Sequence, residues 1–199
     1  MEFYEVINNR RTIREFENKE IPEEILKRIL DAGLKAPSSD HMRQWAPVVV
    51  MDRDVIENVT KDIKPFPCNI TEPKTPVQEM YKIAFPKQHS MLANAGCLIL
   101  PYFKQISNMY NPKDAYALIN YGATWALIEN MLLAATAEGL GCAIHIPVGA
   151  EIESIQKVIG TPKDYILPVV ISVGYPVENA EVPTQISATV EEKVHWNKW

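Results

Sequence analysis

The residues best suited to chemistry gather near the N-terminus. Three of the six arginines of the chain, Arg10, Arg11 and Arg14, lie within five positions and flank Thr12. Guanidinium groups beside a hydroxyl and backbone amides are the donors that a phosphate needs. The same arginines would also suit a solvated surface cluster paired with the acids that follow, and such pairs contribute little to stability. Those acids are Glu15, Glu17 and Glu20. The spacing alone leaves both interpretations open.

A second candidate is the polar stretch Ala36–Trp45, which lies between an expected helix and an expected strand. Loops in that position commonly carry ligand contacts. Taken alone, however, an ordinary connection between two elements is the favoured interpretation. Trp45, at the entry to the strand, is expected in the core rather than in a site.

The third candidate is the stretch Gly139–Pro147. Its two glycines would let the backbone approach a flat ligand, and a tight turn from helix to strand would explain them equally well. Cys142 and His145 are two soft ligands without further partners, so we expect no metal site. Cys142 is expected to be a small buried hydrophobe. The chain carries no catalytic triad order, zinc-protease motif, P-loop or complete dinucleotide fingerprint.

Alternating helices and short buried strands must position these candidates, and this alternation predicts one layered domain of α/β type. Apolar spacing and helix-ending residues place helices at 2–9, 22–36, 55–64, 114–138 and 151–159. Apolar β-branched runs place strands at 47–51, 97–103, 142–146 and 167–173. Pro101 argues that its strand lies at an edge or ends early. The proline-rich stretch 65–76 is expected to be a loop.

The helix expected over 114–138 is apolar nearly all round, so it should be buried on all sides. In a chain this small, such burial suggests that a partner subunit covers one side. The C-terminal extension, residues 177–199, has little core of its own but carries His195, Trp196 and Trp199. These rings would be unusual on a free end and are expected to pack on a neighbouring subunit.

The composition of the chain restricts the classes of function that it can have. The chain has 199 residues, 20 basic and 25 acidic side chains and a net charge of −5, which makes general binding to nucleic acid or anionic membranes a poor prospect. The length suits a single domain, 1–199. Three cysteines without a C-x-x-C pair indicate no disulfide framework. The acidic N-terminus does not resemble a signal peptide, and polar residues interrupt the longest apolar stretch, so a cytoplasmic location is expected.

In combination and order, these features resemble the FMN-dependent nitroreductase family, in its short single-domain branch. The matching stretches cover nearly the whole chain; they are Arg10–Phe16, Ala36–Trp45, Glu129–Ala135, Glu138–Gly141 and Val173–Pro176. The resemblance implies an α+β fold in which helices flank a mixed central sheet. It further implies a domain-swapped homodimer, with the C-terminal tail on the partner and two FMN sites at the interface.

The resemblance also implies roles for particular residues. Arg10 and Thr12 would hold the FMN phosphate with the Arg11 backbone, and Arg14 would face the pyrimidine side of the flavin. The partner subunit would contribute Pro37, Ser38, Ser39 and His41. The flavin face near N5 would be lined by Ile144, His145, Ile146 and Pro147, and polar contacts to the ring would come from Lys87 and Ser90.

The chain departs from the family pattern in two places. The family commonly has a basic phosphate ligand shortly after the Gly-Tyr-Pro stretch, whereas Val182–Ser187 contains none, although Gln185 or Ser187 could assist. The family usually has Asn at the position of His41, and Arg43-Gln44 replaces its Gln-Pro. His41 and Arg43 are therefore candidate substrate contacts, and Arg43 could recognise an acidic substrate or pair with Asp40.

By this resemblance, the expected activity is hydride transfer from NAD(P)H through flavin N5 to a small acceptor, such as a nitroaromatic or a quinone, in ping-pong order. The flavin carries that chemistry, so no catalytic side chain is required. Two alternatives remain open. One is a specialised flavin-fragmenting or dehalogenating enzyme, and the other is a flavin-binding or storage protein without turnover.

Overall fold

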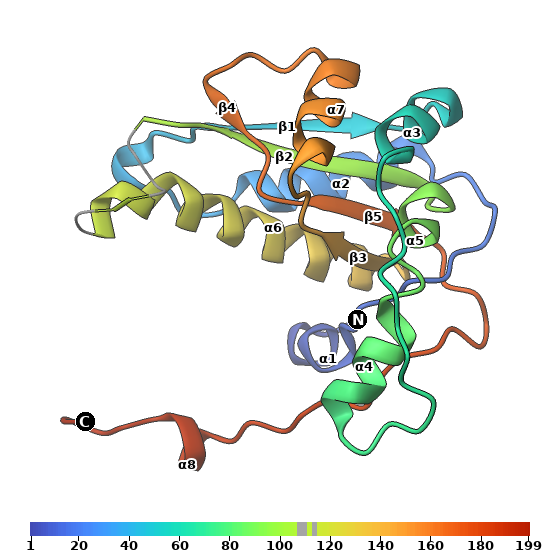
Figure 1. Cartoon of the computed structure of the whole chain (residues 1–199). Helices are drawn as coiled ribbons and strands as arrows, with labels where there is room; N and C mark the ends of the chain where they lie inside the picture. The colour runs from blue at the N-terminus through green and yellow to red at the C-terminus, as the bar shows by residue number, and fades with distance from the viewer. Residues whose placement is uncertain (107–110, 113–114) are drawn as a thin grey trace.

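The computed structural model describes residues 1–106, 111–112 and 115–199. Its centre is a five-stranded sheet in the order β1-β2-β5-β3, with β4 paired to β2 (Figure 1). The strands are β1 (Trp45–Val50), β2 (Cys97–Lys104), β3 (Gly141–His145), β4 (Tyr165–Ile166) and β5 (Val170–Gly174). β5 lies between β2 and β3 and runs antiparallel to both, and β1 and β4 run antiparallel to β2. Every ladder between these strands is therefore antiparallel. The expectation of a mixed sheet is therefore wrong for the single chain, in which the parallel pairing among described residues is an isolated bridge, Thr12–Cys142.

Eight α-helices are found in the described part of the chain. They are α1 (Phe3–Asn9), α2 (Glu23–Leu34), α3 (Arg53–Thr60), α4 (Pro76–Ala84), α5 (Ser90–Ala93), α6 (Ile119–Ala137), α7 (Ala150–Ile159) and α8 (Val190–Lys193). The expected helices and strands exist, with ends displaced by a few residues. The expected helix start at Asp114 lies outside the described residues, and a 3-10 turn, Ala115–Leu118, precedes α6. Helices α4, α5 and α8 are not among the expected elements.

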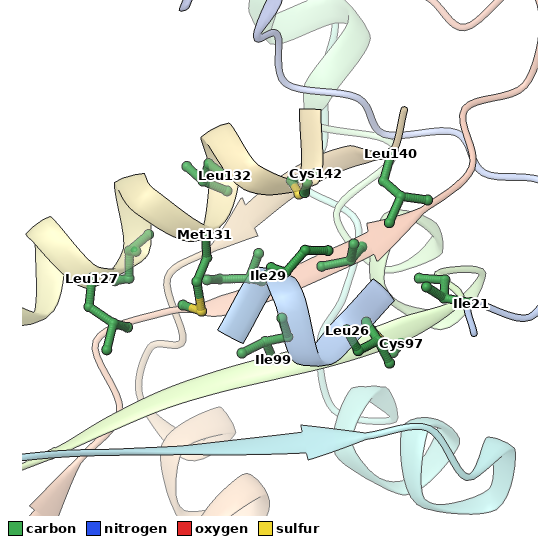
Figure 2. Packing of buried hydrophobic residues seen from close by; sticks show 14 of the residues in the cluster. Ile21, Leu26, Ile29, Cys97, Ile99, Leu127, Met131, Leu132, Leu140 and Cys142 are labelled. Carbon is green, nitrogen blue, oxygen red and sulfur yellow. The ribbon is translucent and has the colours of Figure 1, made fainter. Parts of the chain in front are cut away.

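One face of the sheet is covered by α2 and α6. The spacing of Leu26 and Ile29 on α2 turns both side chains inward, where they meet Leu127 and Met131 of α6 and Ile99 of β2 (Figure 2). The two helices approach closely at Gly33, where an added Cβ would lie 2.6 Å from the Met131 side chain. This layer carries the back wall of the site described below, because Leu132 of α6 and Cys142 of β3 belong to it.

The other face is covered by α3, α5 and α7. Successive side chains of a strand point to opposite faces, so Leu98 and Leu100 of β2 join this second core while Ile99 joins the first. Ile56 of α3 and Ile155 of α7 are buried against it. The result is an α+β domain with a helical layer on each side of one antiparallel sheet.

Pro101 does not mark a sheet edge. It lies inside β2, which pairs with β1 along one side, and its partner across that ladder is Pro47. On the other side of β2, β5 pairs with Cys97–Ile99 and β4 pairs from Phe103 onward. Pro101 falls in the gap between these two pairings, where a missing N–H donor interrupts no ladder. The expectation of an edge or early end is therefore wrong, because the gap lets a central strand accommodate the proline.

Burial of α6 within one chain is one-sided. Leu127, Ile128 and Met131 are buried, whereas Tyr121 and Trp125 are only half-buried. The expectation of burial on all sides is thus not met by the single chain. No helix in the described part of the chain is long and apolar enough to cross a membrane. The C-terminal tail runs away from the body, and Trp196 and Trp199 are 77% and 99% exposed (Figure 1).

Candidate functional site

The segment that carries the arginines is fixed across the ends of β3 and β5. The Ile13 amide donates to the Cys142 carbonyl at 2.9 Å, and the Glu17 amide donates to the Tyr175 carbonyl at 2.8 Å. Gly141 and Gly174 face each other across the β3–β5 ladder. An added Cβ would lie 2.6 Å from Ile13 at Gly141 and 2.7 Å from Phe16 at Gly174. The two glycines therefore leave the room that this segment occupies.

Two neighbouring cavities share the side chains of Arg10, Arg11, Thr12 and Arg14. The larger cavity, of about 270 Å³, is closed by α4 and the start of the tail, through Pro76, Val77, Met80 and Val182–Ile186. The smaller cavity, of about 150 Å³, is closed by α6 and β3, through Leu132, Thr136, Cys142, Ala143 and Ile144. A basic cluster with one apolar wall on each side is suited to an anionic ligand that also carries a flat apolar part.

Arg14 is the most informative member of the cluster. Its Nη1 atom is buried and has no hydrogen-bond partner among the described residues. Burial lowers the pKa of this guanidinium from its ordinary value, although an arginine keeps its charge in proteins. A buried cationic donor without a partner is costly. An acceptor oxygen of a bound ligand would remove that cost.

Arg10 and Arg11 are held differently. The Arg10 Nε lies 3.8 Å from Glu129 Oε1 of α6, and Arg11 Nη1 donates to the Asn8 and Arg10 carbonyls, both at 2.8 Å. No ion pair among the described residues joins the three arginines to Glu15, Glu17 or Glu20, which the surface-cluster interpretation required. The cavities that the arginines line favour the anion-binding interpretation.

The outer wall of the larger cavity is held by ion pairs. Lys87 Nζ lies 2.8 Å from Glu15 Oε2 and also pairs with Glu181. Although burial works against it, hydrogen bonds with the two glutamates raise the pKa of Lys87, and the bond from Lys87 lowers the pKa of Glu15. Lys87 lines neither cavity of the arginine cluster, and the structure places it as an anchor of the tail segment that follows Glu181. Ser90 begins α5 and likewise lines neither cavity.

Some of the residues that line the larger cavity could not be predicted from the sequence pattern. Val77 and Met80 lie on α4, whose start at Pro76 follows the proline-rich loop. The tail segment Val182–Ile186 lacks periodicity and reaches the cavity because Glu79 accepts the Thr184 amide at 3.2 Å. Gln185 lines the cavity in the segment where the family pattern has a basic residue. Thr75 as a helix N-cap before Pro76 is the local feature that would have predicted α4.

The stretch from Pro37 to Arg43 lies elsewhere. Its centre is a 3-10 turn, Ser39–His41, and the Arg43 amide donates to Ser38 Oγ at 3.1 Å. Asp40, His41 and Arg43 all have positive φ angles of 49°, 52° and 46°. Neither cavity of the arginine cluster is lined by any residue of this stretch. One chain alone therefore does not bring the two sets of candidate residues together.

The stretch 144–147 starts at the wall of the smaller cavity and then runs away from it. Ile144 lines the cavity, whereas the His145 side chain is 2% exposed and bonds to Gln88 and Glu151. Ile146 is 60% exposed. Gly139 has φ +77°, as a tight turn from α6 to β3 requires. The glycine pair of the sequence is thus explained by a turn at Gly139 and by the approach of Ile13 at Gly141.

Burial explains the cysteines of this layer. It raises the pKa of Cys97 to about 12, and it raises the pKa of Cys142 as well. A thiol that resists ionisation is a poor metal ligand or nucleophile. Cys142 serves as a small apolar side chain in the wall of the smaller cavity, as expected from the sequence.

The fold and its cavities define an α+β protein with a basic corner formed by Arg10, Arg11 and Arg14. The chain belongs to the nitroreductase family, whose model matches residues 7–175. A protein of Methanothermobacter thermautotrophicus named for an NADH dehydrogenase/NAD(P)H nitroreductase is 25% identical, over 100% of this chain and 88% of that protein. An iodotyrosine deiodinase of Haliscomenobacter hydrossis is 25% identical, over 92% of this chain and 82% of its own. The structure of a nitroreductase with bound FMN from Bacteroides fragilis shares the fold, with a TM-score of 0.70, 22% identity and 100% of each chain covered.

Proposed function

We propose that the chain is an FMN-dependent oxidoreductase that passes hydride from NAD(P)H to a small acceptor such as a nitroaromatic or a quinone. The observation that carries the proposal is the pair of cavities around Arg10, Thr12 and Arg14, with a buried Arg14 nitrogen that lacks a partner. FMN has both features that these cavities suit, a phosphate and a flat ring edged with carbonyl oxygens. Membership of the nitroreductase family and the FMN-bound relative support the same ligand.

When bound, FMN supplies the redox chemistry, because its ring accepts a hydride and returns it to an oxidant. The side chains of the protein bind and orient the cofactor. Arg10 and Thr12 would hold the phosphate together with the backbone at Arg11. Arg14, which has one buried guanidinium nitrogen, would present its positive charge to the pyrimidine side of the ring, and this would favour the more electron-rich form. No side-chain acid or nucleophile is needed.

Because Gln185 is neutral, we expect the FMN phosphate to be bound more weakly than by the basic residue of the family pattern. An ordinary hydrogen bond in place of a charged one costs about 1 kcal/mol. We therefore expect a protein that purifies with only part of its FMN. Added FMN should restore the yellow colour in full.

A homodimer completes the proposed site. The exposed aromatic rings of Phe3 and Tyr4 on α1, the half-buried side of α6 and the extended tail give one chain an unusual amount of uncovered apolar surface. A second copy that covers this surface with its tail, residues 177–199, would also place its own Pro37, Ser38, Ser39 and His41 at the flavin. This arrangement accounts for a stretch that lines neither arginine cavity in one chain.

Anaerobic stopped-flow absorbance tests the activity. Protein loaded with FMN is mixed with NADH and, separately, with NADPH, and the flavin band near 450 nm is followed. We expect prompt bleaching with at least one nicotinamide and reoxidation by a nitroaromatic. FMN binding without bleaching by either nicotinamide would instead identify a flavin-binding protein without turnover. Failure to bind FMN would contradict the proposal altogether.

A second candidate function is reductive dehalogenation of an aromatic amino acid. It is favoured by the relation to an iodotyrosine deiodinase and by the exposed side chains of His41 and Arg43 on a turn with three positive φ angles. Arg43 would meet the carboxylate of such a substrate. The test reduces the FMN-loaded protein with dithionite and adds 3-iodotyrosine. Iodide release faster than reoxidation by a nitroaromatic would favour this candidate over the first.

A further inference from the structure

The turn Ile146–Pro147 is closed by one carboxylate oxygen. Oε2 of Glu151 accepts hydrogen bonds from Nε2 of His145 and from the Val148 amide, each at 2.9 Å. His145 precedes the turn and Val148 follows it, so the two bonds bracket it. The Glu151 amide in turn donates to the Val148 carbonyl at 3.1 Å. The start of α7 and the end of β3 are thereby joined at a single point.

The same histidine is held from its other side. Its Nδ1 lies 3.1 Å from Oε1 of Gln88, and Nε2 of Gln88 donates to the Ala84 carbonyl at 3.0 Å. Ala84 ends α4, the helix that closes the larger arginine cavity. The His145 ring therefore links α4, β3 and α7, and its nitrogens both face side-chain oxygens in the protein interior.

The polar cluster around His145 specifies one local geometry. Burying paired polar groups contributes little net stability compared with apolar packing of the same volume, whereas it strongly favours one geometry. The geometry fixed here belongs to a turn that starts beside the smaller cavity, where Ile144 forms part of the wall. The turn leaves Ile146 and Val148 60% and 55% exposed. A rigid turn with exposed apolar side chains is suited to support a flat ring.

We propose that Glu151 is a positioning residue of the flavin site. Through His145 and the Val148 amide, it fixes the turn Ile146–Pro147 as the surface on which the flavin ring rests, without touching the cofactor itself. This inference rests on the proposed FMN function. It adds a second requirement for FMN binding besides the arginine cluster. The Glu151 carboxylate would affect the ring end of FMN, whereas the arginines would bind its phosphate.

Helix α7 offers a matched control for a merely structural role. Ser154 Oγ donates to Asp62 Oδ2 at 2.5 Å and so ties the same helix to the turn that follows α3. Ser154→Ala removes a side-chain tie of α7 that does not involve the turn. Glu151→Ala removes the tie that does. Both variants should lower the melting temperature, so stability alone does not distinguish them.

The test measures FMN affinity by flavin fluorescence, the shape of the bound flavin absorption band, and amide hydrogen exchange at Val148 without cofactor. For Glu151→Ala we expect FMN binding to weaken about tenfold, the band to lose its fine structure, and the Val148 amide to exchange faster. Ser154→Ala should stay within about twofold of wild type in affinity. Glu151→Gln retains an acceptor oxygen for Val148 and should fall between the two. Should Glu151→Ala fail to fold, this variant carries the comparison.

Two results would overturn the inference. One is an equal FMN affinity and an equal flavin spectrum in the Glu151 and Ser154 variants. The other is unchanged exchange at Val148 in the cofactor-free Glu151 variants. Failure of the proposed function is a separate outcome, because it appears as a wild-type protein that binds no FMN.

Discussion

Two regions that the family resemblance assigns to one site differ sharply in how the chain builds them. The arginine segment, residues 10–14, is fixed to β3 by the hydrogen bond from the Ile13 amide to the Cys142 carbonyl, and it lines two cavities. The turn at residues 37–43 lines neither of them, and His41 and Arg43 have positive φ angles. The first region is complete within one chain. The second is an exposed turn that we expect to contact a partner subunit.

One chain therefore carries the phosphate end of the proposed site and part of its ring end, and it lacks the contacts that residues 37–43 would make. The folded sheet pre-organises the arginines, so their affinity for an anion should depend on the single chain. Contacts from residues 37–43 to the flavin should depend on assembly of the dimer. Mutations in the two regions are therefore expected to fail in different ways.

The largest effect is expected from the tail. Simultaneous Trp196→Ala and Trp199→Ala remove two exposed rings that we expect to be anchors in the dimer, and each anchor of that kind contributes about 2 kcal/mol or more. The double variant should dissociate at concentrations where wild type is dimeric, as measured by sedimentation velocity over a dilution series. Lys198→Ala, in the same tail, should leave the dimer intact. A wild-type protein that is already monomeric at micromolar concentration would remove the basis of the comparison.

Next comes Arg10→Ala, which removes the charged contact proposed for the FMN phosphate. Hydrogen bonds to charged groups contribute about 1.5–3 kcal/mol, so FMN affinity should fall by about 10- to 100-fold in a fluorescence titration. Arg28→Ala is the control. Arg28 forms two 2.7 Å bonds with Glu138, and neither residue lines either cavity. It should cost some stability but leave FMN affinity unchanged, and equal losses in both variants would return the arginines to a surface role.

A somewhat smaller effect is expected from Gly141→Ala. The new methyl group would lie 2.6 Å from the Ile13 Cβ, and overpacking of this kind costs about 1–3 kcal/mol. Because Ile13 moves with its neighbours Thr12 and Arg14, FMN affinity should fall along with the melting temperature. At Gly122 an added Cβ meets nothing within 4 Å. Gly122→Ala should therefore leave FMN affinity near wild type and should not lower the melting temperature, because Gly122 lies inside α6 and alanine favours a helix. A loss matching that of Gly141→Ala would refute the fixed-segment argument.

The smallest effect concerns pH and the outer wall of the larger cavity. Lys87 lowers the pKa of Glu15 in the folded protein, so this pair stabilises the fold above the ordinary carboxyl pKa of about 4.3 and ceases to do so as pH falls through the lowered value. Glu15 is partly exposed, which limits the effect to less than about 1 kcal/mol. The melting temperature of Glu15→Gln should lie below that of wild type at pH 7, and the gap should close toward pH 3. A gap that stays constant with pH would show that the charge of Glu15 is irrelevant.

How much could be predicted from the sequence depended on whether the cause was local. The spacing of Leu26 and Ile29 predicts α2 because helix periodicity is a property of the segment itself. The arginine cluster was identifiable because three like charges in an acidic chain are themselves unusual. Pro101 misled because the gap that accommodates it is formed by β4 and β5, about 65 residues later in the chain.

The missed parts of the site share a non-local origin. The cavity wall at Val182–Ile186 is held by Glu79, and the tail ahead of it by Lys87. None of these pairings has a signature in sequence spacing. The same is true of His145, which the resemblance implied as a lining residue. The bonds of its ring to Gln88 and Glu151 become visible only when α4 and α7 are placed beside β3.

The unpartnered nitrogen of Arg14 has a consequence for the lifetime of the protein in the cell. A ligand that binds only the folded state stabilises it by an amount that grows with the ratio of free ligand to its dissociation constant. A chain that buries an unsatisfied guanidinium until its cofactor arrives is least stable when newly made. Proteases act on the unfolded fraction, so the abundance of this protein should follow the flavin supply, with the lowest levels in riboflavin-starved cells.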